Sequence, residues 1–507
     1  MKNKKQNWFY SNTVKEHFFN PKNILQSKKG IKSFKADGVG IAGHPVCGDV
    51  MKMWIKVDEK KDKIVDCKWQ TFGSLIRGEK VLIPNYFSEK VENITINSEV
   101  LNENGNPAIV EENLIRNYSG KILTYSLSTS KFYHFSVTPN HPIPCFERDG
   151  ISKIVRKKGT RWSEIAENKL QKANSVLKSA SQLRPGDFLI FKINKKIKDA
   201  KELNGDFCKL LGYYVSDGSL SSINRAIFYF GLNEIEYLND LENLANKNKW
   251  SYKTFKRNTE NVLCFQLNEP EIIELLKKHG GLPSKKNFSE KVMSLPPKKQ
   301  MMIVTAYING DGWISKQNEN WEEQYFISTS QENLAYQLQM MLARNLVFAP
   351  IHQRGPRQFK SKGKTYINKG ELNLIFRKKH QYSRIKYHKK EHAFLIPIQR
   401  IIVSDYKGKI YDIGLSDEPK VYKIKGISLH NCASAIASTS MLSVMITEKG
   451  GMPISKVLKI KPKVIAERLG GLPQIKFHCS MLGERALRNA LNDYFKKSGQ
   501  HSRIIKE

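Results

Sequence analysis

The spacing of apolar residues changes several times along this chain. Residues 1–73 read as a helix followed by strands, and the stretch VMKMWIKVDEKKDKIVDCKWQTFG alternates around a charged turn, which predicts a β-hairpin. Residues 74–200 hold short apolar runs such as KVLIPNYF and DFLIFKI, which favour strands. From residue 206 the period becomes helical, as in DFCKLLGYYVSD and ENLAYQLQMMLARNL, with strand-like pieces between. Strand-like runs return from residue 393, and after residue 432 the pattern is helical. A nested order of this kind indicates an insertion within an insertion.

Composition narrows the class of protein. A length of 507 residues predicts two to four domains at about 100–200 residues each. No run of about 18 apolar residues exists, so no membrane span is expected. The basic start MKNKKQNWFYSNTVKEHFF lacks the apolar core of a secretory signal. Seven scattered cysteines favour free or metal-bound thiols in a reducing cytosol, so we expect a cytoplasmic protein.

The net charge of +36 has two interpretations. It is typical of a protein that binds nucleic acid, and it is equally typical of a lysine-rich surface that is simply solvated. The middle of the chain is the better candidate for a nucleic-acid surface, because much of the excess lies there.

Motifs on both sides of residues 74–431 form one ordered set when that segment is left out of the sequence. They are NPKN, ADGVGIAGHPVCGDVMKMWIKV, the junction TFG–CASAIAS, ERLGGLP and KFHCSMLGERALRNALNDY. In this order they resemble the IscU/NifU-type iron–sulfur cluster assembly scaffolds. The resemblance implies a scaffold of α/β (α+β) fold in two pieces, 1–73 and 432–507, with a cysteine desulfurase and cluster acceptor proteins as partners.

The same resemblance implies a ligand set on the scaffold. Thiolates beside an imidazole and a carboxylate suit iron, sulfide or zinc, so the expected cofactor is an iron–sulfur cluster, by family a 2Fe-2S cluster, or zinc. The implied ligands are Cys47, Asp49, Cys432, His478 and Cys479. Cys67 matches no ligand of the family, and we expect it to pack within a strand.

Residues 74–431 carry a second set of motifs. The segment starts SLIRGEKVLIPN, contains TPNH at 138–141 and ends KIYDIGLSDEPKVYKIKGISLHN, directly before a cysteine. It resembles an intein, a self-splicing insert of the all-β Hint fold. The resemblance implies the following catalytic set: Ser74, Thr138, Asn140, His141, Asp412, His430, Asn431 and Cys432.

The implied chemistry begins at Ser74, which attacks the carbonyl of Gly73 and turns an amide into an ester. By the resemblance, His141 acts with Thr138 and Asn140 to strain that amide and to protonate its nitrogen. Inteins usually carry Cys at the first position, so Ser74 is a departure and a weaker nucleophile.

The second half of the implied reaction uses the end of the insert. Cys432 attacks the ester, and Asp412 tunes its thiol. Asn431 closes its side chain onto its own carbonyl with help from His430, and an acyl shift then joins Gly73 to Cys432. Two alternatives stay open: a decayed, splicing-defective insert that leaves a disrupted scaffold, and a Hint module that cleaves without ligating.

A repeated motif lies within the insert. LLGYYVSDG at 210–218 and VTAYINGDG at 304–312 share an apolar helix, a small residue midway and a final acid–glycine. Each alone is equally a buried helix with a glycine cap. As a spaced pair they resemble the LAGLIDADG motifs of homing endonucleases, which implies two αββαββ halves. The resemblance places Asp217 and Asp311 together at a Mg²⁺ site, and Lys291 or its lysine neighbours are open candidates for assisting the reaction.

The expected partner of this segment is double-stranded DNA, namely the insert-free scaffold gene. RGPRQFKSKGKTY and FRKKHQYSRIKYHKK suit the charge of a DNA-binding saddle of strands. The predicted architecture is therefore multidomain. Its parts are the first piece of the scaffold at 1–73, the first part of the Hint domain at 74–200, the endonuclease at 201–392, the second part of the Hint domain at 393–431, and the rest of the scaffold at 432–507.

Overall fold

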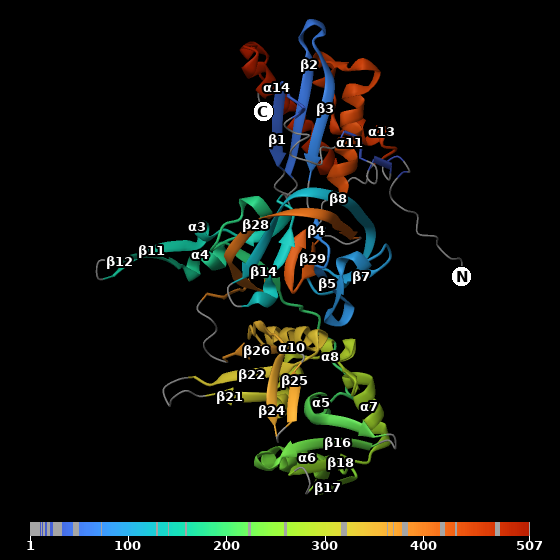
Figure 1. Ribbon diagram of the computed structural model, residues 1–507, viewed down its shortest axis with the longest axis vertical. Coiled ribbons are helices and arrows are strands. Elements are labelled where there is room, and N and C mark those ends of the chain that lie inside the picture. The colour runs from blue at the N-terminus through green and yellow to red at the C-terminus, as the bar shows by residue number, and fades with distance from the viewer. Residues whose placement is uncertain are drawn as a thin grey trace.

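The computed structural model describes residues 11–505 apart from short segments, and its three lobes follow one another along the long axis (Figure 1). The segments outside the description are 12, 14–15, 18–20, 24–32, 44–49, 72–73, 128–129, 140, 158–159, 222–224, 258–260, 316–321, 362–363, 369, 378–383, 416–420, 431–432 and 472–476. Among the described residues, no helix is both long enough and apolar enough to cross a membrane.

The first lobe, at the top of Figure 1, is built from both ends of the chain. Its elements are β1 (Gly38–Gly43), β2 (Val50–Asp58), β3 (Lys63–Thr71), α11 (Ala433–Thr447), β31 (Met452–Pro453), α12 (Ile454–Val457), α13 (Pro462–Arg468) and α14 (Phe477–Lys497). The antiparallel sheet has the order β1-β2-β3-β31, so its last strand comes from the far end of the sequence. α11 and α14 pack on this sheet and bury its apolar face.

Two glycines explain how closely α14 lies on the sheet. A Cβ built on Gly38 would lie 2.2 Å from the carbonyl oxygen of Ala490, and one on Gly40 would lie 2.0 Å from that of Ala486. Any larger side chain at these positions of β1 would push the helix away. The GVGIAG sequence of β1 is therefore a contact surface for α14.

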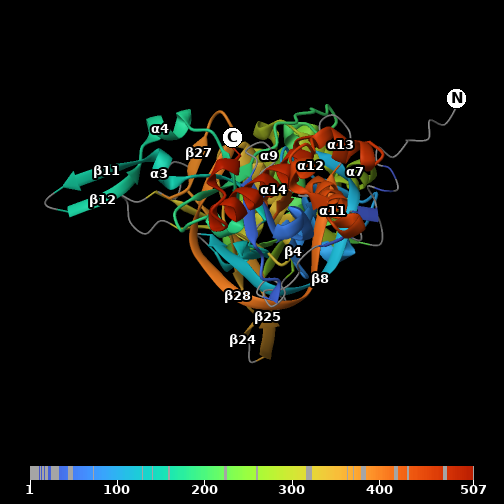
Figure 2. The same ribbon diagram turned by 90° about the horizontal axis from the view of Figure 1, so that it is seen from above.

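The middle lobe is a β structure with a nine-stranded sheet and a smaller sheet. The larger sheet contains β4 (Leu75–Ile76), β7 (Glu99–Leu101), β8 (Pro107–Leu127), β9 (Phe135–Val137), β10 (Pro142–Phe146), β13 (Val176–Ser179), β14 (Phe188–Lys192), β27 (Lys386–His388) and β28 (Ala393–Leu415). The smaller sheet has the order β30 (Ile427–His430), β29 (Val421–Ile424), β5 (Lys80–Ile83) and β6 (Phe87–Lys90). β8 and β28 pair along most of their length and curve around the lobe as a band (Figure 2).

A hairpin of β11 (Ser152–Lys157) and β12 (Thr160–Ile165) projects sideways from the middle lobe, at the left of Figure 1. Two short helices flank it, α3 (Arg148–Ile151) and α4 (Glu167–Lys172).

The lower lobe consists of two halves with the same order of elements. The first half runs α5 (Gly205–Asp217), β15 (Gly218–Ser221), β16 (Arg225–Gly231), α6 (Ile235–Asn248), β17 (Tyr252–Arg257), β18 (Val262–Leu267), with α7 (Pro270–Gly280) after it. The second runs α9 (Pro297–Asp311), β21 (Gly312–Ser315), β22 (Gln324–Thr329), α10 (Glu332–Arg344), β23 (Ile351–Arg354) and β26 (Glu371–Phe376). The sheet orders β15-β16-β18-β17 and β21-β22-β26-β23 are equivalent, which agrees with the predicted αββαββ repeat.

The second half carries an extra hairpin of β24 (Arg357–Ser361) and β25 (Lys364–Asn368) between β23 and β26. Between the halves lie the short strands β19 (Gly281–Leu282) and β20 (Lys285–Lys286) and the helix α8 (Glu290–Ser294). The middle and lower lobes share one continuous cluster of buried apolar side chains.

Candidate functional site

The register of the central strands fixes the surroundings of Ser74. β4 lies between β28 and β9 in the large sheet. Leu75 pairs with Tyr411 of β28 on one side and with Val137 of β9 on the other. Because these pairings are antiparallel, the residue before Leu75 lies beside the residues that follow its two partners. Ser74 therefore lies between Thr138 and Asp412.

Hydrogen bonds hold this arrangement in place. The amide nitrogen of Ser74 donates to Thr138 Oγ1 at 3.0 Å, and the amide nitrogen of Thr138 donates to the carbonyl oxygen of Ser74 at 3.0 Å. The amide nitrogen of His141 donates to the carbonyl oxygen of Thr138 at 3.0 Å, so His141 is tied to the end of β9. Ser74, Thr138, His141 and Asp412 are all buried, with at most 3% of their surface exposed. The structure thus gathers four of the predicted splicing residues in a region closed to water.

The other end of the insert approaches the same region. His430 is the last residue of β30, and β30 packs against β10, which starts directly after His141. Asn140, Asn431 and Cys432 lie outside the described residues. Their predicted roles therefore stay predictions.

The predicted scaffold ligands also fall largely outside the description. Cys47, Asp49 and Cys432 are among the segments not described, and His478 and Cys479 begin α14 without a described side chain. Within the described part of the chain, no group of three or more His, Cys, Asp or Glu side chains is arranged to hold a metal ion.

Cys67 is a free, fully buried cysteine in β3, as its strand position predicted. Burial raises the pKa of its thiol, so this cysteine is held in the unreactive, protonated form.

A second site lies where α5 and α9 pack together in the lower lobe. A Cβ built on Gly212 of α5 would lie 2.4 Å from the carbonyl oxygen of Ile303 and 2.7 Å from the Cβ of Ala306. One turn further along, a Cβ on Gly310 of α9 would lie 2.2 Å from Ser216 Oγ. These small residues at four-residue spacing let the two backbones approach closely. Their C-terminal ends consequently meet.

The two helices end in Asp217 and Asp311, and the two carboxyl groups lie close enough to influence each other. Burial and the neighbouring Asp311 raise the pKa of Asp217 to about 7. Burial also raises the pKa of Asp311, while Lys286 and a hydrogen bond from Tyr307, 3.4 Å from Asp311 Oδ2, oppose that shift. Asp217 Oδ2 is buried and has no hydrogen-bond partner within the part of the chain that the structure describes. Such an oxygen beside a second carboxylate fits a hard divalent cation.

Lys286 is the lysine that the structure places at this acid pair. Its Nζ donates to the carbonyl oxygen of Ser216 at 2.9 Å, next to Asp217. Burial lowers the pKa of Lys286, and the two aspartates oppose that shift. Lys291 instead forms an ion pair with Glu202 at the surface. The sequence left the choice among these lysines open, because Lys286 is 70 residues from Ser216 and no motif marks it.

The two basic stretches lie differently from the predicted saddle. The first forms the separate β24–β25 hairpin, which belongs to neither four-stranded sheet. In the second, β27 pairs with β28 and thus belongs to the sheet of the middle lobe. A strand pairs with a sheet edge through backbone hydrogen bonds, which do not depend on the charge of its side chains. The basic composition of the two stretches therefore did not predict which strands they pair with.

Comparisons with known proteins match two different families to different parts of the chain. The family described as NifU-like N terminal domain matches residues 9–96 and 421–501. The family described as LAGLIDADG-like domain matches residues 298–386. A NifU-like domain is thus split across the chain and interrupted by a segment that contains a LAGLIDADG-like domain, as the motifs predicted.

Curated relatives resemble different parts of the chain. The iron-sulfur cluster assembly scaffold protein IscU 1 of Archaeoglobus fulgidus is 48% identical over 73 residues, which cover 14% of this chain and 46% of that protein. An iron-sulfur cluster assembly SufBD family protein of Mycobacterium tuberculosis is 25% identical over 393 residues, which cover 74% of this chain and 45% of that protein. The chain therefore spans less than half the length of these relatives.

Two solved structures resemble about a third of the chain. The homing endonuclease I-DmoI in complex with DNA and Ca is 13% identical, with a TM-score of 0.25, over 35% of this chain and 84% of that one. The N-terminal LAGLIDADG domain of DUF199/WhiA is 10% identical, with a TM-score of 0.24, over 36% of this chain and 80% of that one.

Proposed function

We propose that the chain is the precursor of an iron–sulfur cluster assembly scaffold, and that residues 74–431 splice themselves out and join Gly73 to Cys432. The observation that carries this proposal is the position of Ser74, which is buried and fixed between Thr138 and Asp412 by strand register and hydrogen bonds. Both neighbours of Ser74, Thr138 and Asp412, are polar and buried, which is unusual at an ordinary strand end.

The first step follows from these contacts. Ser74 Oγ bonds to the carbonyl carbon of Gly73, and the peptide bond between them breaks. The nitrogen of Ser74 gains a proton from His141, which takes up the proton of the Ser74 hydroxyl in exchange. Thr138 Oγ1 already accepts a hydrogen bond from that nitrogen, with 3.0 Å between the two atoms, so it orients the amide that breaks. The site is closed to water, which favours transfer of the acyl group to a thiol over hydrolysis.

The second step uses the end of the insert. The thiol of Cys432 attacks the ester and releases the hydroxyl of Ser74. The side-chain nitrogen of Asn431 then attacks its own carbonyl carbon and breaks the bond to Cys432, with His430 moving the proton. A shift of the acyl group from sulfur to the freed nitrogen of Cys432 restores an amide. Asp412, buried beside Ser74, would assist Cys432.

The host lobe supports this assignment of the junctions. Without residues 74–431, only residues 72, 73 and 432 connect β3, which ends at Thr71, to α11, which starts at Ala433. α11 and β3 pack against each other, and connections of two to six residues are typical between a strand and a helix. The two host segments are therefore normally connected once the insert is removed.

The long alignment with the SufBD family protein gives independent support. Residues outside 74–431 make up less than a third of the chain, so an alignment over 74% of it includes most of that segment. A protein of a different name thus resembles most of the segment 74–431. This is the expected distribution of an element that moves between host genes.

The lower lobe is proposed to be a DNA endonuclease that acts on the insert-free gene. Asp217 and Asp311 would hold divalent cations, normally Mg²⁺, which supply activation of water and stabilise the leaving oxygen. Lys286, beside both carboxylates, contributes positive charge where the phosphate becomes more negative. The close packing of α5 on α9 holds the two carboxylates near each other.

In the spliced product the cluster is the cargo of the scaffold. Cys47, Cys432 and Cys479, with Asp49 and His478, would receive it from a cysteine desulfurase and pass it to acceptor proteins. Cys432 would thus act first in splicing and later as a ligand.

The test of splicing is the fate of the purified full chain on a denaturing gel and by mass. The parent chain should yield the excised insert and a chain in which Gly73 is joined to Cys432. Asn431→Ala should yield neither, while hydroxylamine should still release residues 1–73 from the ester. A parent chain that stays whole would indicate a decayed insert, and separate host pieces without ligation would indicate a cleaving module.

The test of the endonuclease is digestion of an insert-free scaffold gene with Mg²⁺. Asp217→Asn and Asp311→Asn should each abolish cleavage, and both variants should still splice. Cleavage that survives either substitution would refute the assignment of the acid pair.

A further inference from the structure

The two host segments already form one folded lobe before splicing. Ile64 of β3 pairs with Met452 of β31, and α14 lies on β1 and β2. The apolar core of the lobe draws on both segments and on neither of the other lobes. From the first segment come Met51, Met53, Ile55, Ile64 and Trp69, and from the second come Leu442, Ile446, Leu482, Leu487 and Leu491. All ten side chains are fully buried or nearly so.

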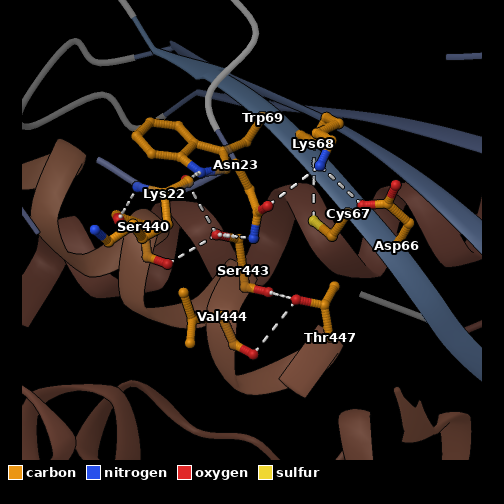
Figure 3. Close-up of polar contacts among 10 residues, drawn as sticks. All are labelled: Lys22, Asn23, Asp66, Cys67, Lys68, Trp69, Ser440, Ser443, Val444 and Thr447. Atoms are coloured by element: carbon orange, nitrogen blue, oxygen red, sulfur yellow. Dashed lines mark hydrogen bonds and ion pairs between the residues drawn. The ribbon is translucent and has the colours of Figure 1, made fainter. Parts of the chain in front are cut away.

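Polar contacts cross between the same two segments (Figure 3). The amide nitrogen of Lys22 donates to Ser440 Oγ of α11 at 2.8 Å, and Asn23 Nδ2 donates to Ser443 Oγ at 3.3 Å. Trp69 Nε1 donates to the carbonyl oxygen of Lys22 at 2.8 Å and so ties this turn to β3. The middle of α11 is thus attached to the first host segment.

Further polar contacts join the first host segment to α14 and to the residues that follow it. The amide nitrogen of Val39 donates to Asp493 Oδ2 at 2.8 Å. The guanidinium of Arg503 makes two hydrogen bonds to the carboxylate of Asp62, at 2.8 and 2.9 Å. A two-pronged pair of this geometry fixes orientation as well as distance.

Short connections link this lobe to the splicing site. Three residues separate Thr71 of β3 from Leu75 of β4, and two separate His430 of β30 from Ala433 of α11. At about 3.3–3.6 Å per residue, the longer connection spans at most roughly 14 Å. α11 also packs against β28 of the middle lobe. The position of the host lobe therefore determines where both junctions lie.

We infer that the folded host lobe is a positioning element for splicing, in which residues 1–73 bind residues 432–507 without a covalent bond. This inference rests on the proposed splicing reaction. Once Ser74 has displaced the amide, only the ester holds the first segment to the insert. The host lobe keeps the ester beside the thiol, so that transfer of the acyl group to Cys432 exceeds hydrolysis. The partner of each host segment is the other segment of the same host.

The first experiment tests association without relying on splicing. A recognition sequence for a specific protease is inserted between Gly73 and Ser74 of the full chain that carries Asn431→Ala. After cutting, residues 1–73 should elute with the remainder in size-exclusion chromatography and separate only in denaturant. Elution of residues 1–73 alone would overturn the inference, and this result stands whether or not the chain splices.

The second experiment tests positioning during splicing. Gly40→Ala places a Cβ 2.0 Å from the carbonyl oxygen of Ala486, so β1 and α14 must move apart. In the control variant Gly150→Ala, the new Cβ has no atom within 4 Å. Gly40→Ala should reduce the ratio of ligated to unligated host at least tenfold, and Gly150→Ala should leave it unchanged. Ser440→Ala, which removes the cross-segment hydrogen bonds to Lys22 and His17, should cause a smaller loss.

A separate measurement of ester formation shows whether Gly40→Ala damages the splicing site itself. In chains that also carry Asn431→Ala, hydroxylamine should release the same amount of residues 1–73 with and without Gly40→Ala, because the splicing site itself is intact. Equal ligation by the parent and Gly40→Ala chains would overturn the inference. Absence of the ester from every chain would refute the proposed splicing, and the cut-chain experiment would still decide the association.

Discussion

Replacement of Asp217 by asparagine should stabilise the lower lobe at pH 8 while it removes DNA cleavage. The carboxyl group of Asp217 lies at the meeting point of α5 and α9, and its Oδ2 is buried without a partner among the described residues. An ionised carboxylate there loses hydration and faces Asp311. A neutral amide of the same shape avoids both penalties.

The magnitude follows from the shift in pKa. The pKa of Asp217 rises from 3.8 to about 7, and each unit corresponds to about 1.36 kcal/mol, so the penalty at high pH is at most about 4 kcal/mol. The aspartate also supports the charge of Lys286, which the variant loses, so we expect a net gain of about 1–3 kcal/mol. Between pH 3.8 and 7 the folded state binds more protons than the unfolded state, so stability falls as the pH rises. The gain should therefore be full above pH 7 and vanish below pH 4.

The assay is hydrogen exchange of the amides of α5 and α9 in the full chain. A gain of 1.4 kcal/mol corresponds to about tenfold slower exchange, so exchange at pH 8 should slow at least several-fold. Asp206→Asn, in the first turn of the same helix, is the matched control. Burial opposes ionisation of Asp206, but hydrogen bonds from Lys247 and Asn248 outweigh it and lower its pKa, so this variant should lose stability at pH 8. Faster exchange in Asp217→Asn than in the parent at pH 8 would refute the reasoning.

Three further predictions concern the insert. Lys286→Met should reduce the rate of DNA cleavage by about 10²–10³ without weakening DNA binding, whereas Lys291→Met should change neither, as measured by digestion and by gel shift. Ser74→Cys should speed splicing, because a thiol ionises more readily than a hydroxyl; an equal or slower rate in a gel time course would show that the site is adapted to oxygen. Deletion of residues 201–392 with the ends rejoined should abolish splicing, because the rest of the chain should misfold. Asp217→Asn should splice normally, and a deleted chain that splices at the parent rate would contradict this prediction.

The sequence predicted those parts of the fold that depend on local patterns. The helices that end at Asp217 and Asp311, with strands directly after them, appear where the repeated motif placed them. The small residues of that motif, such as Gly212, could be recognised because a helix contact with no room for a side chain leaves a sequence signature. The split NifU-like domain was likewise predicted, because its motifs are continuous once residues 74–431 are left out.

Features that depend on pairing across long sequence separations could not be predicted. The position of Ser74 between two other strands depends on register, and a shift of one residue would turn its side chain to the other face. Lys286 reaches the acids only because β20 folds back onto α5, a contact that no local pattern records. The assignment of Lys386–His388 to the middle lobe arises from edge pairing with β28, for which basic side chains give no signal.

The continuous core between the middle and lower lobes shows why a nested sequence does not yield separable domains here. The phenol oxygen of Tyr133, in the middle lobe, accepts hydrogen bonds from Gln339 of α10 and from the amide nitrogen of Ile351, the latter at 3.2 Å. Gln337, also on α10, donates to the carbonyl oxygen of Asn85 at 2.9 Å. Both glutamines and Tyr133 are fully buried or nearly so, and each polar group left without its partner costs about 1–3 kcal/mol. The apolar cluster that surrounds them would be exposed at the same time. Loss of the lower lobe would therefore remove a substantial part of the stability that holds β4 and β9 in register around Ser74, whereas loss of the carboxylate of Asp217 leaves every one of these contacts in place.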